Sequence, residues 1–514
     1  MGNPRVTETE TATEAERPLG RVRGTHDWLP DEYAQLASLE RELLDQFARA
    51  GYRPMRTPIL EFSELHQRKS GAGIVAKLFD VPGLGSGEVC LRPELTASIV
   101  RAFSDLEDCP SLPWRVSMSG PVFRRLTPSQ DRDREFTQVG VELIGAGGPA
   151  ADAEVIWLAD WTLRNLGIEQ PKIRIGHVGL ILELFDRSGL PPSASTAVVE
   201  SLSEAAAEGE NLMALESALD RLSGWIEGHR KSEVDNLPAP RDESAGIDWL
   251  FNQIVPHLTG RRSSRAITER LRRKCELSGT LHDTLTRLLD EAHALARLRG
   301  SAEQVLDRLV GEFEDLAPRS VAALRDLVDL LGHHGVESER IELDLGFGRG
   351  IGFYTQVIFE ILVTTPRGPV EVCGGGRYDG LARVLGSHRD DRGVGFAFGL
   401  ERLLTVLHSL SRKVESQNSL GCLVTTGRPG VMTPRAIALG AFLRDRVRIP
   451  VVISDLDFDG SVAYARQNHL GSVLVVGSSV ELWNLDHGAV RIVQDGELID
   501  EIRGHLAILG KDRP

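Results

Sequence analysis

Residues 120–145 read GPVFRRLTPSQDRDREFTQVGVELIG, a pattern that predicts two β-strands joined by a polar loop. Side chains of a strand alternate between two faces. One face of the second strand is mostly apolar and suits a core: Thr137, Val139, Val141 and Leu143. The other face, which also carries Phe136 and Ile144, places Gln138 and Glu142 two residues either side of Gly140. A small ligand fits over this glycine, between the amide and the carboxylate; the alternative is an ordinary hairpin with one solvated face.

The composition limits the class of protein. The chain has 514 residues, 41% of them hydrophobic, which is enough for two to four domains. A net charge of −15 argues against general binding of nucleic acid, although a local basic patch is compatible with it. The five cysteines are scattered and form no CxxC pair, which predicts reduced thiols, a cytoplasmic location and no metal site: Cys90, Cys109, Cys275, Cys373 and Cys422.

The N-terminal segment, residues 1–18, is rich in Thr, Glu and Ala and has no apolar stretch. This composition predicts a disordered tail and not a signal peptide. The chain contains no apolar run long enough to span a membrane, so we expect no membrane association.

Residues 19–184 are predicted to form the first part of an α/β core. Leucines and Phe47 recur at helical spacing between Pro30 and Gly51, which predicts a helix. Residues 53–61, RPMRTPILE, predict an edge strand because proline limits pairing on one side. Residues 91–102, LRPELTASIVRA, predict a strand that turns into a helix, and a Glu at this junction favours the first helical turn.

Residues 185–340 are rich in Ala, Leu, Glu and Arg at helical spacing, which predicts a helical insertion. Seven basic residues fall between Arg261 and Lys274. A charge run is usually a solvated helix face. Because the chain is acidic as a whole, we favour that interpretation over RNA contact.

Three glycine-containing strings follow in residues 341–408, the second part of the predicted core. LDLGFGRGIGFYTQVIFEILV, 343–363, predicts a strand after a glycine-rich approach that carries Arg349. CGGGRYDGL, 373–381, has the wrong spacing for a dinucleotide fingerprint, and a hairpin loop is compatible with it. GVGFAFGLERLL, 393–404, predicts a strand that leads into a helix.

The C-terminal part has a different pattern. Residues 409–419 form a polar linker. Strands and helices then alternate through residues 420–514, which predicts a small parallel α/β domain.

In their order along the chain, these strings resemble the histidyl-tRNA synthetase family of class II aminoacyl-tRNA synthetases. That family includes a non-charging paralogue, the regulatory subunit of ATP phosphoribosyltransferase. Residues 53–61, 120–145 and 393–404 are similar to class II motifs 1, 2 and 3, and residues 343–363 and 373–381 to two histidine-specific motifs. The resemblance implies a class II synthetase-like antiparallel sheet with flanking helices, a helical insertion, and an anticodon-binding-like C-terminal α/β domain.

The resemblance also implies two sets of site residues. One set would bind L-histidine: Glu94, Thr96, Gln138, Glu142, Arg349 and Tyr354. Glu94 and Thr96 would hold the α-ammonium, and Glu142 would accept a hydrogen bond from the imidazole. The second set would face a nucleotide: Arg124, Arg132 and Arg402. Arg349 would be the catalytic residue of a ligase, at the histidine carboxylate and the α-phosphate.

Several positions depart from the synthetase pattern, mostly on the nucleotide side. Leu126 and Thr127 stand where motif 2 has a Glu and an Arg. A Leu cannot accept a hydrogen bond, so polar groups of ATP would lose a partner there. Four further departures replace a His, a Gly, an Asp and a Tyr of the family: Thr137, Leu95, Gly352 and Phe353.

Two hypotheses follow. The first is a histidine-binding regulatory subunit without cofactors, which pairs with the short-form ATP phosphoribosyltransferase catalytic subunit and transmits feedback inhibition in histidine biosynthesis. The second is a histidine–tRNA ligase, which uses ATP and Mg to form histidyl-adenylate and charge tRNA-His. The altered motif 2 favours the first, and the retained arginines with the C-terminal domain favour the second. Both imply a homodimer, since motif 1 is a dimer-interface element.

Overall fold

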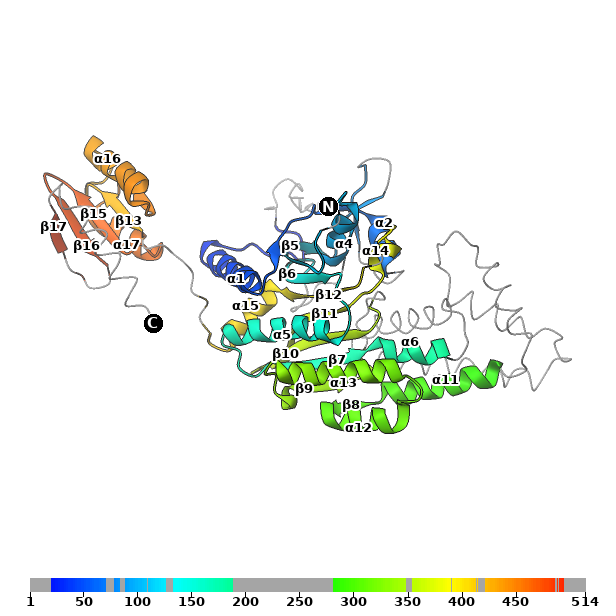
Figure 1. Ribbon diagram of the computed structural model, residues 1–514. Coiled ribbons are helices and arrows are strands. Elements are labelled where there is room, and N and C mark those ends of the chain that lie inside the picture. The colour runs from blue at the N-terminus through cyan, green and yellow to red at the C-terminus, as the bar shows by residue number, and fades with distance from the viewer. Residues whose placement is uncertain are drawn as a thin grey trace, which may run out of the picture. The chain divides into compact units, whose positions relative to one another are not determined.

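The computed structural model describes residues 20–70, 78–83, 88–108, 110–125, 133–187, 281–347, 354–389, 391–412, 414, 421–485, 488 and 490–493. The chain forms two compact units, residues 1–414 and 415–514. Figure 1 shows both.

The first unit is built on a nine-stranded sheet in which most neighbours are antiparallel. Two pairs are parallel, β1 with β5 and β7 with β9. In spatial order the strands are β1 (Arg53–Pro54), β5 (Trp114–Phe123), β6 (Glu135–Ile144), β12 (Gly393–Gly399), β11 (Gly368–Arg377), β10 (Val357–Thr365), β7 (Lys172–His177), β9 (Ile341–Asp344) and β8 (Arg299–Ser301). The predicted class II synthetase-like sheet is therefore present in this unit.

Helices cover both faces of this sheet (Figure 1). One face packs against the main hydrophobic core, to which these helices contribute: α1 (Pro30–Arg49), α5 (Pro149–Asn165), α6 (Val178–Arg187), α11 (Leu281–Ala296), α12 (Ala302–Phe313), α13 (Pro318–His333) and α15 (Leu400–Ser409). A 3-10 turn, Ser338–Arg340, precedes β9. The other face packs against α4 (Thr96–Asp105) and α14 (Leu381–Val384), around a second core cluster.

A small second sheet lies beside α4. It pairs β2 (Leu60–Phe62), β4 (Val89–Leu91) and β3 (Phe79–Asp80), and α2 (Ser63–Ser70) continues from β2. The sequence predicted one edge strand over 53–61, but only Arg53 and Pro54 pair with β5, and residues 60–62 belong to this other sheet. Between them, the proline at position 58 has no N–H to donate to a ladder, which is consistent with the break.

The predicted helix between Pro30 and Gly51 is confirmed as α1, and local chemistry explains its limits. Pro30 occupies the first helical turn, where its missing N–H costs nothing. Asp31 and Glu32 lie in that turn and complement the helix dipole. At the other end Gly51 has φ of 86°, a left-handed conformation that glycine adopts without strain.

Residues 185–340 were predicted to be a helical insertion. The part between 188 and 280, with its basic run, lies outside the described residues. From 281 onward the chain is integral to the core: β8 pairs with β9 in the main sheet, and α11, α12 and α13 bury residues in the main hydrophobic cluster. Their helical periodicity is therefore that of core helices with one buried face.

The C-terminal unit has a five-stranded sheet, and the prediction of a parallel domain is only partly correct. β13 (Cys422–Thr425) pairs in parallel with β14 (Val451–Ile453) and β15 (Ser472–Val476). β16 (Val480–Asn484) and β17 (Val490–Val493) are antiparallel additions. They follow β15 as short-loop hairpins, which connect antiparallel neighbours only. The helices are α16 (Pro434–Phe442), the π-helix η3 (Leu443–Val447) and α17 (Phe458–Gln467).

Candidate functional site

The two faces of β6 lie in different environments, as its alternation predicted. Val139, Val141 and Leu143 are buried in the main core. On the opposite face Ile144 is buried and Phe136 partly buried in the second cluster, together with Val116 of β5. Val116 is paired directly with Glu142, so the Glu142 side chain belongs to this second face. The Glu142 carboxylate therefore lies beside the apolar residues of the second cluster.

Glu142 is 4% exposed and takes a specific hydrogen bond. The hydroxyl of Tyr378 donates to its Oε2 at 2.5 Å. Burial, and next the Glu142 carboxylate, raise the pKa of Tyr378 well above its ordinary value, so the hydroxyl keeps its proton and remains a donor. Gly395 lies opposite Glu142 on β12, and a Cβ at this position would overlap the carboxylate. The glycine thus makes room for the acid.

A buried ion network fixes the end of β11, which Tyr378 directly follows. Arg377 is fully buried and binds Asp152 of α5, with Nε 2.8 Å from Oδ1. Its Nη1 donates to Asp379 Oδ1 at 2.9 Å and to the carbonyl of Ala146 at 3.0 Å. Burial raises the pKa of Asp152 to about 6 against the opposing effect of Arg377, so Asp152 is ionised at neutral pH. This pairing holds Tyr378 in register for Glu142.

Tyr354 lies beside the same network. A Cβ on Gly376 would come within 2.8 Å of the Tyr354 ring, so the ring packs over that glycine. The next residue, Thr355, donates its N–H to the Arg377 carbonyl at 2.8 Å, and its Oγ1 accepts from the N–H of Asp379 at 3.0 Å. The structure therefore brings Tyr354, Tyr378 and Glu142 together. The triple glycine forms part of β11 and not a hairpin loop, and the missing side chains at Gly375 and Gly376 leave room for Phe396 and the Tyr354 ring.

Glu94 borders the same face at the start of α4. Its neighbour Leu95 packs in the second core cluster with Tyr378. The Glu94 carboxylate accepts the N–H of Thr96 at 2.7 Å and that of Ala97 at 3.1 Å. This is the predicted role at the first helical turn, where free N–H groups favour a negative charge. The Nδ1 of His66 on α2 lies 3.7 Å from Oε1 of the same carboxylate.

The predicted nucleotide-side residues are only partly described. Arg124 donates Nε to the Pro93 carbonyl at 3.0 Å, and its guanidinium lies 5.0 Å from the centre of the Phe136 ring. It is therefore next to Glu94 and on the Glu142 face of β6. Arg402 is exposed and donates to the Glu371 carbonyl at 3.1 Å. The remaining predictions, Arg132, Arg349 and the departures at 126, 127, 352 and 353, lie outside the described residues.

Gln138 is half-buried and lies between two glycines, Gly120 on β5 and Gly399 on β12. The open floor that the sequence predicted over Gly140 stays a prediction, and a Cβ at that glycine would overlap the Phe396 carbonyl of β12. Sequence reasoning missed Tyr378 and Arg377 as site residues. The string CGGGRYDGL that contains them was noticed, but nothing in its spacing indicated that the tyrosine reaches Glu142 across the sheet.

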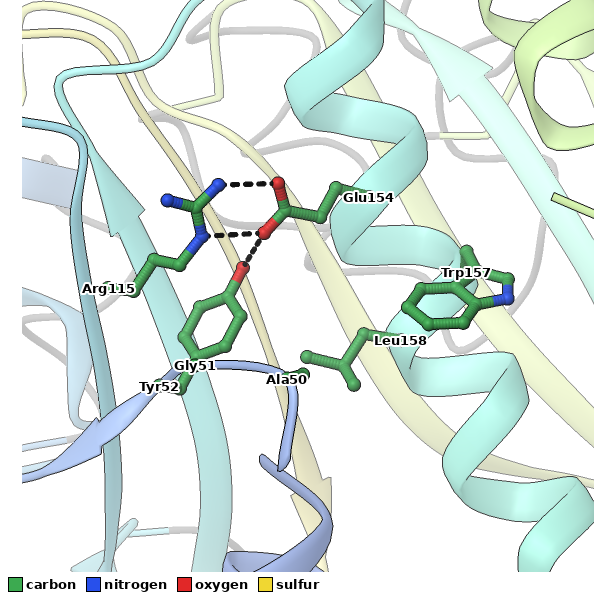
Figure 2. A pocket seen from close by; sticks show the side chains of 7 residues that line it. All are labelled: Ala50, Gly51, Tyr52, Arg115, Glu154, Trp157 and Leu158. Carbon is green, nitrogen blue, oxygen red and sulfur yellow. Dashed lines mark hydrogen bonds and ion pairs between the residues drawn. The ribbon is translucent and has the colours of Figure 1, made fainter. Parts of the chain in front are cut away.

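A cavity of about 430 Å³ lies on the opposite face of the sheet (Figure 2). Arg115, part of its lining, is paired with Leu143, which belongs to the main core face. Arg115 holds Glu154 through two hydrogen bonds of 2.9 and 2.8 Å, and the Tyr52 hydroxyl donates to Glu154 at 2.9 Å. Because these charged groups satisfy one another, the cavity is a structural junction of α1, β5 and α5 and does not contain the predicted site.

Two further properties concern cofactors and membranes. Within the described ranges, no cluster of three or more His, Cys, Asp or Glu side chains is arranged to hold a metal ion. None of the helices in the described ranges is long and apolar enough to cross a membrane.

The large, mostly antiparallel sheet flanked by helices, with a buried carboxylate on β6, is that of a class II aminoacyl-tRNA synthetase-like protein. The histidyl-tRNA synthetase family model matches residues 24–232 and 250–403. The chain belongs to the histidyl-tRNA synthetase family.

Relatives within this family carry two different names. An ATP phosphoribosyltransferase regulatory subunit of Moorella thermoacetica is 33% identical over 387 residues, which cover 75% of this chain and 82% of that protein. A histidine–tRNA ligase of Methanocaldococcus jannaschii is 28% identical over 497 residues, covering 96% and 97%. A regulatory subunit of Syntrophotalea carbinolica is 29% identical over 475 residues and covers 92% of both chains. Near full-length similarity therefore occurs to proteins of both names.

Solved structures agree on the fold. Histidyl-tRNA synthetase from a Nostoc species has a TM-score of 0.62 at 16% identity, covering 95% of this chain and 100% of that one. A Bacillus halodurans protein described as ATP phosphoribosyltransferase regulatory subunit/histidyl-tRNA synthetase has a TM-score of 0.58 at 22% identity, covering 88% and 97%. At these identities the likeness establishes the fold alone.

Proposed function

We propose that this chain is a histidine-binding regulatory subunit of ATP phosphoribosyltransferase. It would bind L-histidine without carrying out chemistry of its own and without a cofactor. Its partner would be the short-form catalytic subunit in the cytoplasm, and its own core would be a homodimer.

The pocket geometry supports the choice of ligand. Glu142 is buried and accepts a hydrogen bond from the Tyr378 hydroxyl, and a buried carboxylate suits the N–H donor of an imidazole. The Glu94 carboxylate, held at the start of α4 by the Thr96 N–H, would pair with the α-ammonium group of the amino acid. A site of hydrogen-bonding groups rejects apolar analogues, since these would leave buried polar atoms unpaired. An amino acid with an imidazole side chain fits this set.

One observation carries the regulatory role. The amino-acid side of the site keeps Glu94, Gln138, Glu142 and Tyr354, while Leu126 and Thr127 replace the Glu and Arg expected on the nucleotide side. Activation requires ATP to be held with its α-phosphate at the histidine carboxylate. Without these polar partners for ATP, the site would bind histidine but would not form histidyl-adenylate. The regulatory subunit of Moorella thermoacetica, at 33% identity, supports the same role.

The alternative is a histidine–tRNA ligase, supported by the near full-length similarity to the Methanocaldococcus jannaschii enzyme. In that case ATP and Mg would be required, Arg349 would be catalytic, Arg124, Arg132 and Arg402 would bind the nucleotide, and tRNA-His would be a partner. Arg124 lies next to the Glu94 loop, where such a nucleotide would approach.

Reconstitution tests the proposal. The chain is mixed with the short-form phosphoribosyltransferase of the same organism, and the rate of phosphoribosyl transfer to ATP is measured with and without L-histidine. We expect the mixture to be active and inhibited by histidine, and the catalytic subunit alone to lack that inhibition. A catalytic subunit whose activity and histidine response are the same with and without this chain contradicts the regulatory role.

A further inference from the structure

Arg92 directly follows β4, two residues before Glu94, and its side chain is 1% exposed. Its guanidinium donates Nε to the carbonyl of Pro121 at 2.9 Å. Nη1 lies 3.0 Å from the carbonyl of Thr57 and 3.1 Å from its hydroxyl. These hydrogen bonds go to main-chain carbonyls and a hydroxyl. Burial lowers the pKa of Arg92, and the more distant charges of Glu61 and Glu94 oppose that effect.

A buried cation whose hydrogen bonds go to neutral acceptors is an expensive feature of a fold. The acceptors belong to two chain segments, which the guanidinium holds together. Thr57 lies between β1 and β2, and Pro121 lies in β5. The main chain of Arg92 joins the same two segments, because its N–H donates to the Ile59 carbonyl at 3.0 Å and its carbonyl accepts from Phe123 at 2.9 Å. The side chain and the main chain of Arg92 together fix the position of the residues that directly precede Glu94.

The sheet is shaped to receive this guanidinium. Gly120 of β5 lies under Nη2 of Arg92, and a Cβ at that position would overlap it. Arg124 donates to the carbonyl of Pro93, the residue between Arg92 and Glu94, at 3.0 Å. Residues 92 and 93 are thus held from both sides, and Glu94 is the next residue along the chain.

We propose that Arg92 is a positioning residue for the ammonium subsite. It fixes residues 92–94 so that the Glu94 carboxylate stays at the start of α4, where it receives the ammonium group of a free amino acid. This role rests on the proposed histidine site, and Arg92 itself touches no ligand.

A pair of glycine variants tests the role. In Gly120→Ala the new Cβ displaces the guanidinium of Arg92. Gly399→Ala is the matched control, because Gly399 is the other strand neighbour of Gln138 and, among the described residues, its Cβ would come no nearer than 3.8 Å to another atom, Arg402 Cβ. Amide-resolved hydrogen exchange is measured at Thr96 and Ala97, which donate to Glu94, and histidine affinity is measured by calorimetry. We expect about tenfold faster exchange and about tenfold weaker histidine binding in Gly120→Ala, the size of one lost hydrogen bond, and parent-like values in Gly399→Ala.

Arg92→Met separates positioning from space filling. The apolar side chain fills a similar volume, but the carbonyls of Pro121 and Thr57 lose their donor, so a moderate loss of thermal stability is expected and circular dichroism shows whether the variant is folded. The Thr96 and Ala97 amides should exchange faster than in the parent. Parent-like protection of these amides in both Gly120→Ala and Arg92→Met would overturn the proposal. A parent protein that binds no histidine would refute the proposed function alone, because the exchange comparison still decides whether Arg92 positions Glu94.

Discussion

At the scale of single residues, the proposed histidine site depends on Glu142, a carboxylate that is buried and hydrogen-bonded. Strand alternation places Glu142 on the face of β6 that packs against the second cluster. The Tyr378 hydroxyl donates a hydrogen bond to its carboxylate, and the missing side chain of Gly395 leaves space for it. A buried polar group without a partner costs roughly 1–3 kcal/mol, so each of these features matters. This carboxylate is the acceptor that the proposed ligand would use.

Replacing Glu142 with Ala removes the proposed imidazole acceptor. Histidine binding should weaken by about 1.5–3 kcal/mol, the range for a hydrogen bond to a charged group. Isothermal titration calorimetry on the parent and Glu142→Ala measures the difference, and circular dichroism shows whether the variant is folded. Equal histidine affinity in the two folded proteins would remove Glu142 from the site.

At the scale of secondary-structure elements, the sequence indicated much of the central sheet. The alternation of 135–144, the strand-to-helix turn at 91–102 and the strand-to-helix pattern of 393–404 appear as β6, β4–α4 and β12–α15. These elements are predictable because their signals are local, namely period-two burial and helix-start residues. The triple glycine of β11 gave no such local signal, because the reason for glycine there is that Tyr354 and Phe396 pack against it, and both come from other segments.

Non-local pairing also explains what the sequence did not predict. The antiparallel addition of β16 and β17 and the integration of β8 into the main sheet depend on partners distant in sequence or on hairpin geometry. The contact between Tyr378 and Glu142 spans 236 residues of sequence. The motif resemblance identified the strings that carry Glu142 and Tyr378, whereas the hydrogen bond between these residues is visible only in the structure.

The junction of β7 and α6 yields a pH-dependent prediction. His177 ends β7, is 5% exposed, and has no hydrogen-bond partner for Nδ1 among the described residues. Burial lowers its pKa from 6.5 to about 4, and Glu183, which accepts from the Ser320 N–H at the start of α13, opposes this. The folded state therefore binds the proton more weakly than the unfolded state. The stability due to neutral His177 is complete above pH 6.5 and is lost as the pH falls toward 4.

The expected loss over this range is up to about 3 kcal/mol in the free energy of unfolding, from the size of the pKa change. Urea denaturation of the parent and His177→Gln between neutral pH and pH 4 measures it. The variant should lose less stability than the parent on acidification, because it has no proton to gain at this position. Identical pH dependence in the two proteins would show that His177 is not responsible.

At the scale of the whole molecule, the chain combines a class II core with a separate C-terminal α/β unit. Both parts occur in relatives named as ligases and in relatives named as regulatory subunits. The presence of the second unit therefore does not identify the function. What separates the two roles is whether bound histidine meets a correctly placed nucleotide, since a displacement of about 1 Å can cost on the order of a hundredfold in rate.

The most direct test is histidine-dependent exchange of pyrophosphate into ATP by the full-length protein, measured with saturating L-histidine, ATP and Mg. Formation of histidyl-adenylate requires fixed positive charge at the α-phosphate as well as an ordered nucleotide. Because Leu126 and Thr127 stand where motif 2 of the family has a Glu and an Arg, we predict no exchange above the background without histidine. Robust exchange that depends on histidine would contradict the account and make the chain a histidine–tRNA ligase.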